Sequence, residues 1–367
     1  MNVPFVDLYM QYLNIKSEID SAINDVIKES AYIRGRFVSN FEKNFAHSYG
    51  MKNCIGVGNG TDAIFIILKM LNIGAGDEVI TTGHSWISTS EMISLAGARP
   101  IFVDVEEDYY TIDPNQIEEN ITPKTKAILP VHIYGQAANL DKIQDICRKY
   151  GLFLIEDCAQ SHFTKYKGAF VGTMGIASAF SFYPGKNLGA YGDAGAIITN
   201  DDALARKMRM YANHGSLQKH QHEMEGINSR LDGMQAAILS VKLKYIHEWN
   251  EKRIQAADKY CQLLDGIPEV ILPKTREQTV HTFHVFVIQC EQREKLIEYL
   301  NKKNIQSAIH YPVFLPFLPP YKSKNDGAER FRTLTKISNK ILSLPIYPEI
   351  DPNQQAYISD AIRSFFK

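Results

Sequence analysis

The sequence predicts an α/β fold in which a large domain, built on a mostly parallel central sheet with helices on both faces, precedes a smaller C-terminal α/β domain. Over the first two-thirds of the 367 residues, short apolar runs alternate with segments of helical period, which is the pattern of repeated βαβ units. After about residue 230 this alternation stops. Because no Pro/Gly-rich linker separates the two parts, we expect packed domains at 1–245 and 246–367.

The expected elements of the large domain follow one another closely. Strands are predicted at 53–58, 77–82, 99–105, 126–132 and 152–157, and helices at 61–72, 87–96 and 140–150. Beyond the change of pattern, we predict one long helix over 231–253, a strand at 282–290, and helices at 293–303 and 331–342. Ligands of such sheets bind at the carboxyl ends of the strands, so the motifs found there matter most for function.

Composition excludes several classes of function. The 40 basic and 41 acidic side chains give a net charge of -1, so no overall field attracts nucleic acid or a membrane. The N-terminus lacks the pattern of a signal peptide, and the longest apolar helical stretch, 63–73, is too short to span a bilayer. The five cysteines are scattered, and no metal-ligand spacing such as HExxH occurs. We expect a cytoplasmic protein with reduced thiols and no metal site.

Lys186 lies in the most informative stretch, SFYPGKNLGAYGDAG at 181–195, between the apolar runs 176–182 and 194–198. A lysine at the end of a buried strand loses hydration, which lowers the pKa of its amine. A neutral amine can attack a carbonyl and form a Schiff base. A lone lysine is ordinarily a solvated surface charge, so this hypothesis depends on the motifs found elsewhere in the chain.

The glycine-rich turn GVGNGTD at 56–62 joins a predicted strand to a predicted helix. Glycines allow close approach of the backbone, and the helix N-terminus offers unpaired N–H groups to an anion such as a phosphate monoester. The turn matches neither a Walker loop nor a Rossmann fingerprint. The alternative is a plain glycine turn in which Thr61 or Asp62 caps the helix.

Asp157 stands at the end of the buried run FLIED at 153–157. Strand alternation places Glu156 and Asp157 on opposite sides, so only one of them can face a central ligand. A buried carboxylate requires a partner, and a protonated pyridine nitrogen is one candidate. A helix cap or an arginine-paired structural acid is the alternative.

The aromatic and histidine residues are less decisive. Trp86 follows a predicted strand and could stack on a planar cofactor, although a single aromatic residue more often has a packing role. His132 ends a predicted strand, His162 follows the Asp157 strand, and His310 precedes Tyr311 and a proline. A Ser-His-Asp hydrolase would need a Gly-x-Ser-x-Gly elbow, and none is present.

Three segments taken together, EDCAQSH at 156–162, SFYPGKNLG at 181–189 and NSRLDGMQAA at 228–237, resemble the DegT/DnrJ/EryC1/StrS family of nucleotide-sugar aminotransferases. The resemblance runs from VPFVDL at 3–8 to the C-terminal region. It implies the aspartate aminotransferase-like fold, also called fold type I, of enzymes that use pyridoxal 5'-phosphate. It also implies a homodimer with shared active sites.

The resemblance assigns a role to each matching residue. Lys186 would be the catalytic lysine, holding the cofactor as a Schiff base and later moving protons. The other cofactor contacts would be Asp157 on the ring nitrogen, Gln160 on the ring hydroxyl, Trp86 on the ring face, and Gly60, Thr61 and Ser181 on the phosphate. Asn228 would reach the phosphate of the partner subunit. Tyr183, His310 and Tyr311 are the expected substrate contacts.

The implied reaction is a ping-pong transamination in which L-glutamate converts the cofactor to pyridoxamine phosphate, and the amine then passes to a keto-sugar. The turn at 58–63, Tyr183-Pro184-Gly185 and His310-Tyr311-Pro312 resemble the branch that aminates C3 of dTDP-linked 3-keto-6-deoxyhexoses, in the galactose or glucose series. The setting implied is deoxyamino-sugar and polysaccharide biosynthesis. A C4 aminotransferase for a UDP- or GDP-linked 4-keto sugar is the alternative, as is a non-catalytic regulatory protein of the same fold.

Overall fold

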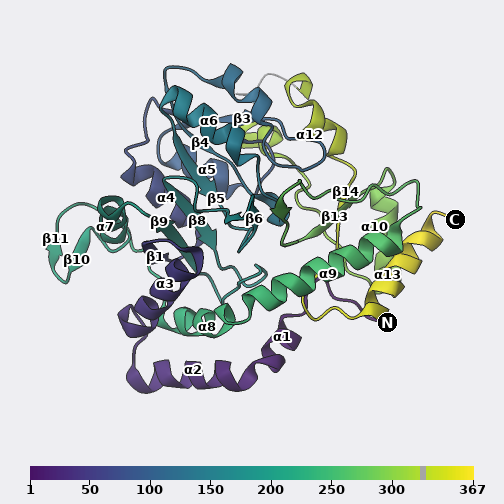
Figure 1. Cartoon of the computed structure of the whole chain (residues 1–367), viewed down its shortest axis with the longest axis horizontal. Coiled ribbons are helices and arrows are strands. Elements are labelled where there is room, and N and C mark those ends of the chain that lie inside the picture. Colours follow the sequence, from purple (N-terminus) through teal and green to yellow (C-terminus); the bar gives the residue numbers. More distant parts are fainter. Residues whose placement is uncertain (323–327) are drawn as a thin grey trace.

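A seven-stranded sheet forms the centre of the computed structural model, which describes residues 1–322 and 328–367 (Figure 1). The strand order is β1-β9-β8-β5-β4-β2-β3. Strand β9 is antiparallel to β1 and β8, and the other neighbours pair in parallel, which confirms a mostly parallel sheet. The strands are β1 Asn53–Val57, β2 Glu78–Thr82, β3 Arg99–Val103, β4 Thr125–Leu129, β5 Phe153–Asp157, β8 Ala177–Ser181 and β9 Gly195–Thr199.

Helices cover both faces of this sheet, as the sequence predicts. One face packs against α4 Gly60–Met70, α5 Ser88–Leu95 and α7 Asp202–Tyr211. The other face packs against α3 Gly35–Tyr49 and α6 Leu140–Tyr150, and outside them lie α2 Lys16–Glu29 and α8 Gly233–Leu243. Successive side chains divide between these two cores because the strand period is two: Val79 belongs to the first core and Ile80 to the second.

The smaller C-terminal part is built on the antiparallel pair β13 Phe286–Gln289 and β14 Ile341–Leu344. Its helices are α9 Ile246–Leu264, α10 Arg293–Lys302 and α13 Pro352–Phe365. Val3 is fully buried in this core and forms a bridge with Ile305, so the chain begins and ends in the same part of the fold. We propose a domain boundary at residues 245 and 246, with the first residues of the chain returning to the smaller domain.

The remaining elements are short. They are α1 Leu8–Asn14, β6 Lys165–Tyr166, β7 Ala169–Phe170, β10 Ser216–Gln218, β11 Gln221–His222, β12 Thr279–Val280, α11 Pro319–Lys322 and α12 Arg332–Ile337, with 3₁₀ turns at Pro114–Gln116, Glu118–Asn120, Ile133–Gly135, Leu315–Phe317 and Ala328–Arg330. Across the described residues, no helix combines the length and the apolar character needed to cross a membrane.

The prediction of one helix over 231–253 is wrong. The structure has two helices, α8 and α9, separated by Lys244 and Tyr245, and Figure 1 shows α9 extending from α8 toward α13. The side chains of both separating residues bond to Glu18 of α2. Because α8 packs against α2 and α3 while α9 packs against α13, tertiary contacts impose this break where the sequence offers neither glycine nor proline.

The predicted helix over 331–342 is also partly wrong. Helix α12 ends at Ile337, and Ile341 already belongs to β14. The segment Ile341–Leu344 is fully buried and pairs with β13, so sheet formation decides its conformation. Short buried apolar runs do not distinguish a strand from a helix by periodicity alone.

Candidate active site

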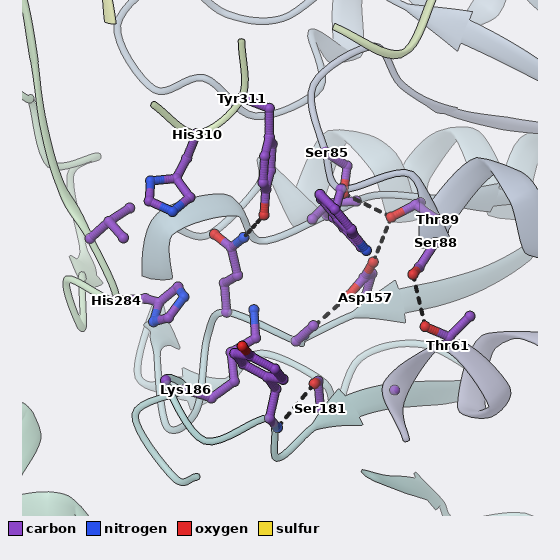
Figure 2. A pocket seen from close by; sticks show the side chains of 18 of the residues that line it. Thr61, Ser85, Ser88, Thr89, Asp157, Ser181, Lys186, His284, His310 and Tyr311 are labelled. Atoms are coloured by element: carbon purple, nitrogen blue, oxygen red, sulfur yellow. Dashed lines mark hydrogen bonds between the residues drawn. The ribbon is translucent and has the colours of Figure 1, made fainter. Parts of the chain in front are cut away.

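A cavity of about 570 Å³ lies where the carboxyl ends of β5 and β8 meet the N-terminus of α4 (Figure 2). The smaller domain closes it with residues that include Arg253 and His284. All of the predicted site residues except Asn228 line this one cavity: Gly60, Thr61, Trp86, Asp157, Gln160, Ser181, Tyr183, Lys186, His310 and Tyr311. Residues from distant parts of the sequence therefore meet where a parallel sheet is expected to bind its ligand.

Lys186 occupies the turn that follows β8. Its backbone N–H donates to the carbonyl oxygen of Tyr183 at 2.8 Å, and its side chain extends into the cavity (Figure 2). Burial lowers the pKa of the amine to about 8, although the charge of Asp157 acts in the opposite direction. At neutral pH, more of this amine is therefore unprotonated than in an exposed lysine.

Asp157, only 4% exposed, presents its carboxylate to the same cavity. Its Oδ2 atom accepts a hydrogen bond from Thr89 Oγ1 at 2.8 Å, and its Oδ1 atom accepts one from the backbone N–H of Ala159 at 3.1 Å. Thr89 is held in turn by Ser85, whose hydroxyl lies 2.8 Å from Oγ1. Burial raises the pKa of Asp157, while these bonds and Lys186 partly offset the shift. A cation against this carboxylate would stabilise its charged form.

Glu156 faces away from the cavity, as strand alternation predicts. Its side chain is fully buried and lies 3.0 Å from His132 Nε2. It also accepts hydrogen bonds from the backbone N–H groups of Gly172, Met174 and Gly175 at 2.7, 2.8 and 2.7 Å. His132 Nδ1 accepts from a backbone N–H, so Nε2 is the donor to Glu156. Glu156 therefore fixes the loop that leads to β8, which makes it a structural acid.

The turn between β1 and α4 forms another part of the cavity wall. Asn59 caps α4 by accepting a hydrogen bond from the backbone N–H of Asp62 at 2.7 Å. Gly60 and Thr61 begin the helix, where backbone N–H groups have no carbonyl partner within the helix. A Cβ atom on Gly60 would lie 2.7 Å from the Cβ of Ser181, so only glycine allows the first turn of α4 to pack this closely against Ser181. These features fit an anionic group at the helix N-terminus.

Gln160 and Tyr311 are joined across the cavity. Gln160 Oε1 accepts a hydrogen bond from the backbone N–H of Tyr134 at 2.7 Å, and its Nε2 donates to the Tyr311 hydroxyl at 2.9 Å. The Tyr311 ring lies 5.5 Å, centre to centre, from that of Trp86. Trp86 and Tyr183 are 57% and 60% exposed, which places them at the mouth of the cavity.

His310 is part of the wall contributed by the smaller domain. Its Nδ1 lies 2.8 Å from the Ser343 hydroxyl, and burial lowers its pKa to about 4. Its carbonyl oxygen accepts hydrogen bonds from the side chains of His84 and Tyr134. His310 is therefore a neutral group at physiological pH, suited to hydrogen bonding with a substrate.

Asn228 lies outside the cavity. It is exposed and forms a backbone bridge with Asn213. The next residue, Ser229, accepts a hydrogen bond from the backbone N–H of Gly58 at 3.0 Å and donates to Asp62 at 2.7 Å. Asn228 is thus attached to the outside of the turn between β1 and α4 and does not line its own cavity.

Sequence reasoning missed several residues of the site. Ser85, Ser88 and Thr89 line the cavity, as do Arg253 and His284. The spacing of Ser85 and Thr89 is one helical turn, but hydroxyl residues at this spacing are too common to single out. Arg253 is the last residue of the segment interpreted as one long helix rich in Ala, Lys and Leu, so nothing in its neighbourhood indicated a binding role.

Comparison with known proteins identifies the family of the chain. The chain matches the profile of the DegT/DnrJ/EryC1/StrS aminotransferase family over residues 13–363. It is 42% identical over 366 residues to the dTDP-3-amino-3,6-dideoxy-alpha-D-galactopyranose transaminase of Aneurinibacillus thermoaerophilus, covering 99% of each chain. It is also 42% identical over 369 residues to a protein of Geobacillus stearothermophilus named pleiotropic regulatory protein, covering 100% of this chain and 99% of the relative.

A similar solved structure carries a cofactor. It is the NtdA protein of Bacillus subtilis with bound PMP, to which the chain is 31% identical with a TM-score of 0.92. The alignment covers 100% of this chain and 85% of that one. The likeness extends over the whole chain, so it includes both the central sheet and the smaller domain that together form the cavity.

Proposed function

Because the chain belongs to the DegT/DnrJ/EryC1/StrS aminotransferase family, we propose that it transfers an amino group from L-glutamate to C3 of a dTDP-linked 3-keto-6-deoxyhexose. The protein is an aminotransferase that depends on pyridoxal phosphate. The product would be a dTDP-3-amino-3,6-dideoxyhexose of the galactose or glucose series. The name of the Aneurinibacillus relative supports both the nucleotide and the sugar position.

One observation carries this proposal: the amine of Lys186, the carboxylate of Asp157 and the open N-terminus of α4 share a single cavity. These are the groups that an aldehyde, a pyridine nitrogen and a phosphate require. The close packing of Gly60 on Ser181 sets the N-terminus of α4 beside the end of β8, which supports a phosphate bound by both segments. The residues present therefore fit pyridoxal phosphate.

The roles of the residues follow from their surroundings. Bound pyridoxal phosphate supplies a carbonyl that condenses with amines and a ring that withdraws electrons from the adjacent carbon. Lys186 would hold the cofactor and, once displaced by the donor, carry a proton on Nζ to and from the substrate carbon. Asp157, oriented by Thr89, would keep a proton on the ring nitrogen. Gln160 would bond the ring hydroxyl and Trp86 would cover the ring.

The sugar would enter at the exposed end of the cavity. Tyr183 lies at the mouth, and His310 and Tyr311 line the wall from the smaller domain. We propose these three residues as substrate contacts. His310 is neutral and Tyr311 carries a hydroxyl, so both can bond to sugar hydroxyl groups without competing with Lys186 as bases.

The decisive experiment distinguishes amination at C3, amination at C4 and the absence of both. The purified protein, loaded with pyridoxal phosphate, would be incubated with L-glutamate and either a 3-keto or a 4-keto sugar, each as its dTDP form. NMR would locate the new C–N bond, and we expect it at C3. Amination at C4 alone would support the alternative of a C4 aminotransferase, whose nucleotide would then be tested with UDP- and GDP-linked 4-keto sugars. A yellow preparation that borohydride bleaches, but that aminates neither sugar, would contradict the proposed substrate.

A purely regulatory role makes a different prediction. The name of the Geobacillus relative is the observation that raises this alternative. A protein of that kind need not exchange amino groups with L-glutamate. We expect the loaded protein to lose its yellow colour on addition of L-glutamate and regain it with 2-oxoglutarate. Failure of both changes would favour the regulatory role.

We also propose a homodimer in which Asn228 reaches the phosphate of the partner subunit. Its exposed position beside the phosphate-binding turn of its own chain supports this arrangement. Light scattering should give twice the chain mass of 41.6 kDa. A monomer with full activity would contradict the shared site.

Gly60→Ala should weaken the binding of pyridoxal phosphate by about tenfold, because the new methyl group would clash with the Cβ of Ser181 and push the N-terminus of α4 away from it. The dissociation constant would be measured by titrating the cofactor into the apoprotein. Gly185→Ala is the matched control, since a Cβ there would meet Tyr183 at an ordinary 3.7 Å. Equal affinities of the two variants would show that the packing of Gly60 on Ser181 does not position a phosphate site.

A further inference from the structure

Arg253 of α9 is a buried arginine on the cavity wall with no role so far. Its side chain belongs to a residue that is 3% exposed, and it lines the cavity together with His284. Its Nη1 atom donates hydrogen bonds to the carbonyl oxygens of Phe283, His284 and Ile346 at 3.3, 3.4 and 3.0 Å. These three contacts anchor one corner of the guanidinium to the smaller domain.

The opposite edge of the guanidinium lacks partners. Nε is buried and makes no hydrogen bond with any described residue, and Nη2 donates to none of them. No described carboxylate forms an ion pair with Arg253, and Glu349 acts on it only from a longer distance. Burial lowers the pKa of Arg253 to about 10, so the group remains a cation at neutral pH.

A buried cation with no carboxylate in direct contact is costly unless a ligand supplies a negative charge there, and Glu349 acts on Arg253 without forming an ion pair. The edge formed by Nε and Nη2 has the geometry that binds the two oxygens of a carboxylate. We propose that Arg253 binds a carboxylate of the amino donor and thereby selects an acidic amino acid. The inference rests on the proposed function, since it concerns the donor of that reaction.

The position of Arg253 inside the cavity favours the amino donor, rather than the diphosphate of the sugar nucleotide, as the ligand of its guanidinium. The donor must bring its amine to the point where the Lys186 amine reacts, and its α-carboxylate is attached to the carbon that bears this amine. Arg253, Lys186 and His284 line the same cavity, and burial, together with the charges of Lys186 and Arg253, lowers the pKa of His284. The exposed mouth, marked by Trp86 and Tyr183, remains for the larger sugar nucleotide.

The test uses Arg253→Gln, which removes the charge, and Arg253→Lys, which keeps the charge but loses the two-pronged edge. Glutarate, a dicarboxylate without an amine, would be titrated calorimetrically into the loaded enzyme, and each half-reaction would be followed by the colour of the cofactor. We expect Arg253→Gln to weaken glutarate binding and raise the KM for L-glutamate by about tenfold to a hundredfold. Arg253→Lys should lie between this variant and the native protein.

The half-reaction with the keto-sugar is the internal control. A donor-binding role leaves its rate nearly unchanged, whereas a purely structural role slows both half-reactions together and lowers the melting temperature. Arg363→Gln is the matched control, because Arg363 also donates to backbone carbonyls, of Leu263 and Asp265, away from the cavity. Unchanged glutarate binding in Arg253→Gln would overturn the inference. If the native protein itself fails to react with L-glutamate, the proposed function fails instead.

Discussion

Lys186→Ala should reduce turnover by about 10⁴-fold, the largest loss expected for any single substitution in this chain. The variant loses both the amine that would hold the cofactor and the base that would move the proton, and no other described lysine lines the cavity. Steady-state transamination with L-glutamate measures the effect, and borohydride should no longer fix the cofactor to the protein. Lys207→Ala, which removes an exposed lysine on α7, is the control and should behave like the native protein.

Stability measurements would test whether unfolding causes this loss. The pKa of Lys186 is about 8 in the folded protein and near 10.5 when exposed, so between these values the unfolded chain binds more protons. The stability of the native protein therefore gains a contribution as pH rises through this window, and Lys186→Ala lacks it. At neutral pH the variant should be at least as stable as the native protein in urea unfolding. A variant that keeps its fold and its turnover would contradict the role of Lys186.

The parts of the site that could be predicted are those set by strand periodicity and by the ends of strands. Glu156 and Asp157 are adjacent acids, and the period of two in a strand is enough to send them to opposite faces. Lys186 follows β8, and a lysine flanked by buried segments has few ways to remain hydrated. Local sequence therefore predicts that Asp157 and Lys186 reach the cavity from the large domain.

The parts that could not be predicted depend on contacts between distant segments. Helices α8 and α9 separate at Lys244 and Tyr245 because Glu18, more than two hundred residues away, bonds to both. Thr89 supports Asp157 across 68 positions of sequence. Arg253 reaches the cavity from α9, which begins after this break and packs within the smaller domain. No local pattern encodes such contacts.

Asp157→Asn should lower turnover by about 10²- to 10³-fold while leaving the protein folded. The amide has nearly the shape of the carboxylate and can still accept the hydrogen bond of Thr89, but it carries no charge to keep a ring nitrogen protonated. Thr89→Val should produce a smaller loss, since the charge remains but its orientation is no longer fixed. Single-turnover rates with L-glutamate would measure both, and the cofactor affinity of each variant would be determined in parallel.

Glu156→Gln is the contrasting substitution, because it changes the neighbouring acid in the same strand. Removing the charge that accepts from His132 and three backbone N–H groups should lower the free energy of unfolding by about 3 kcal/mol. The molecules that remain folded should keep nearly native turnover, since Glu156 faces away from the cavity. The two adjacent acids would then show opposite defects, one in the chemistry and one in the fold. If Asp157→Asn instead lost stability and kept its turnover, the carboxylate of Asp157 would be a structural group, and its place opposite Lys186 would have no catalytic meaning.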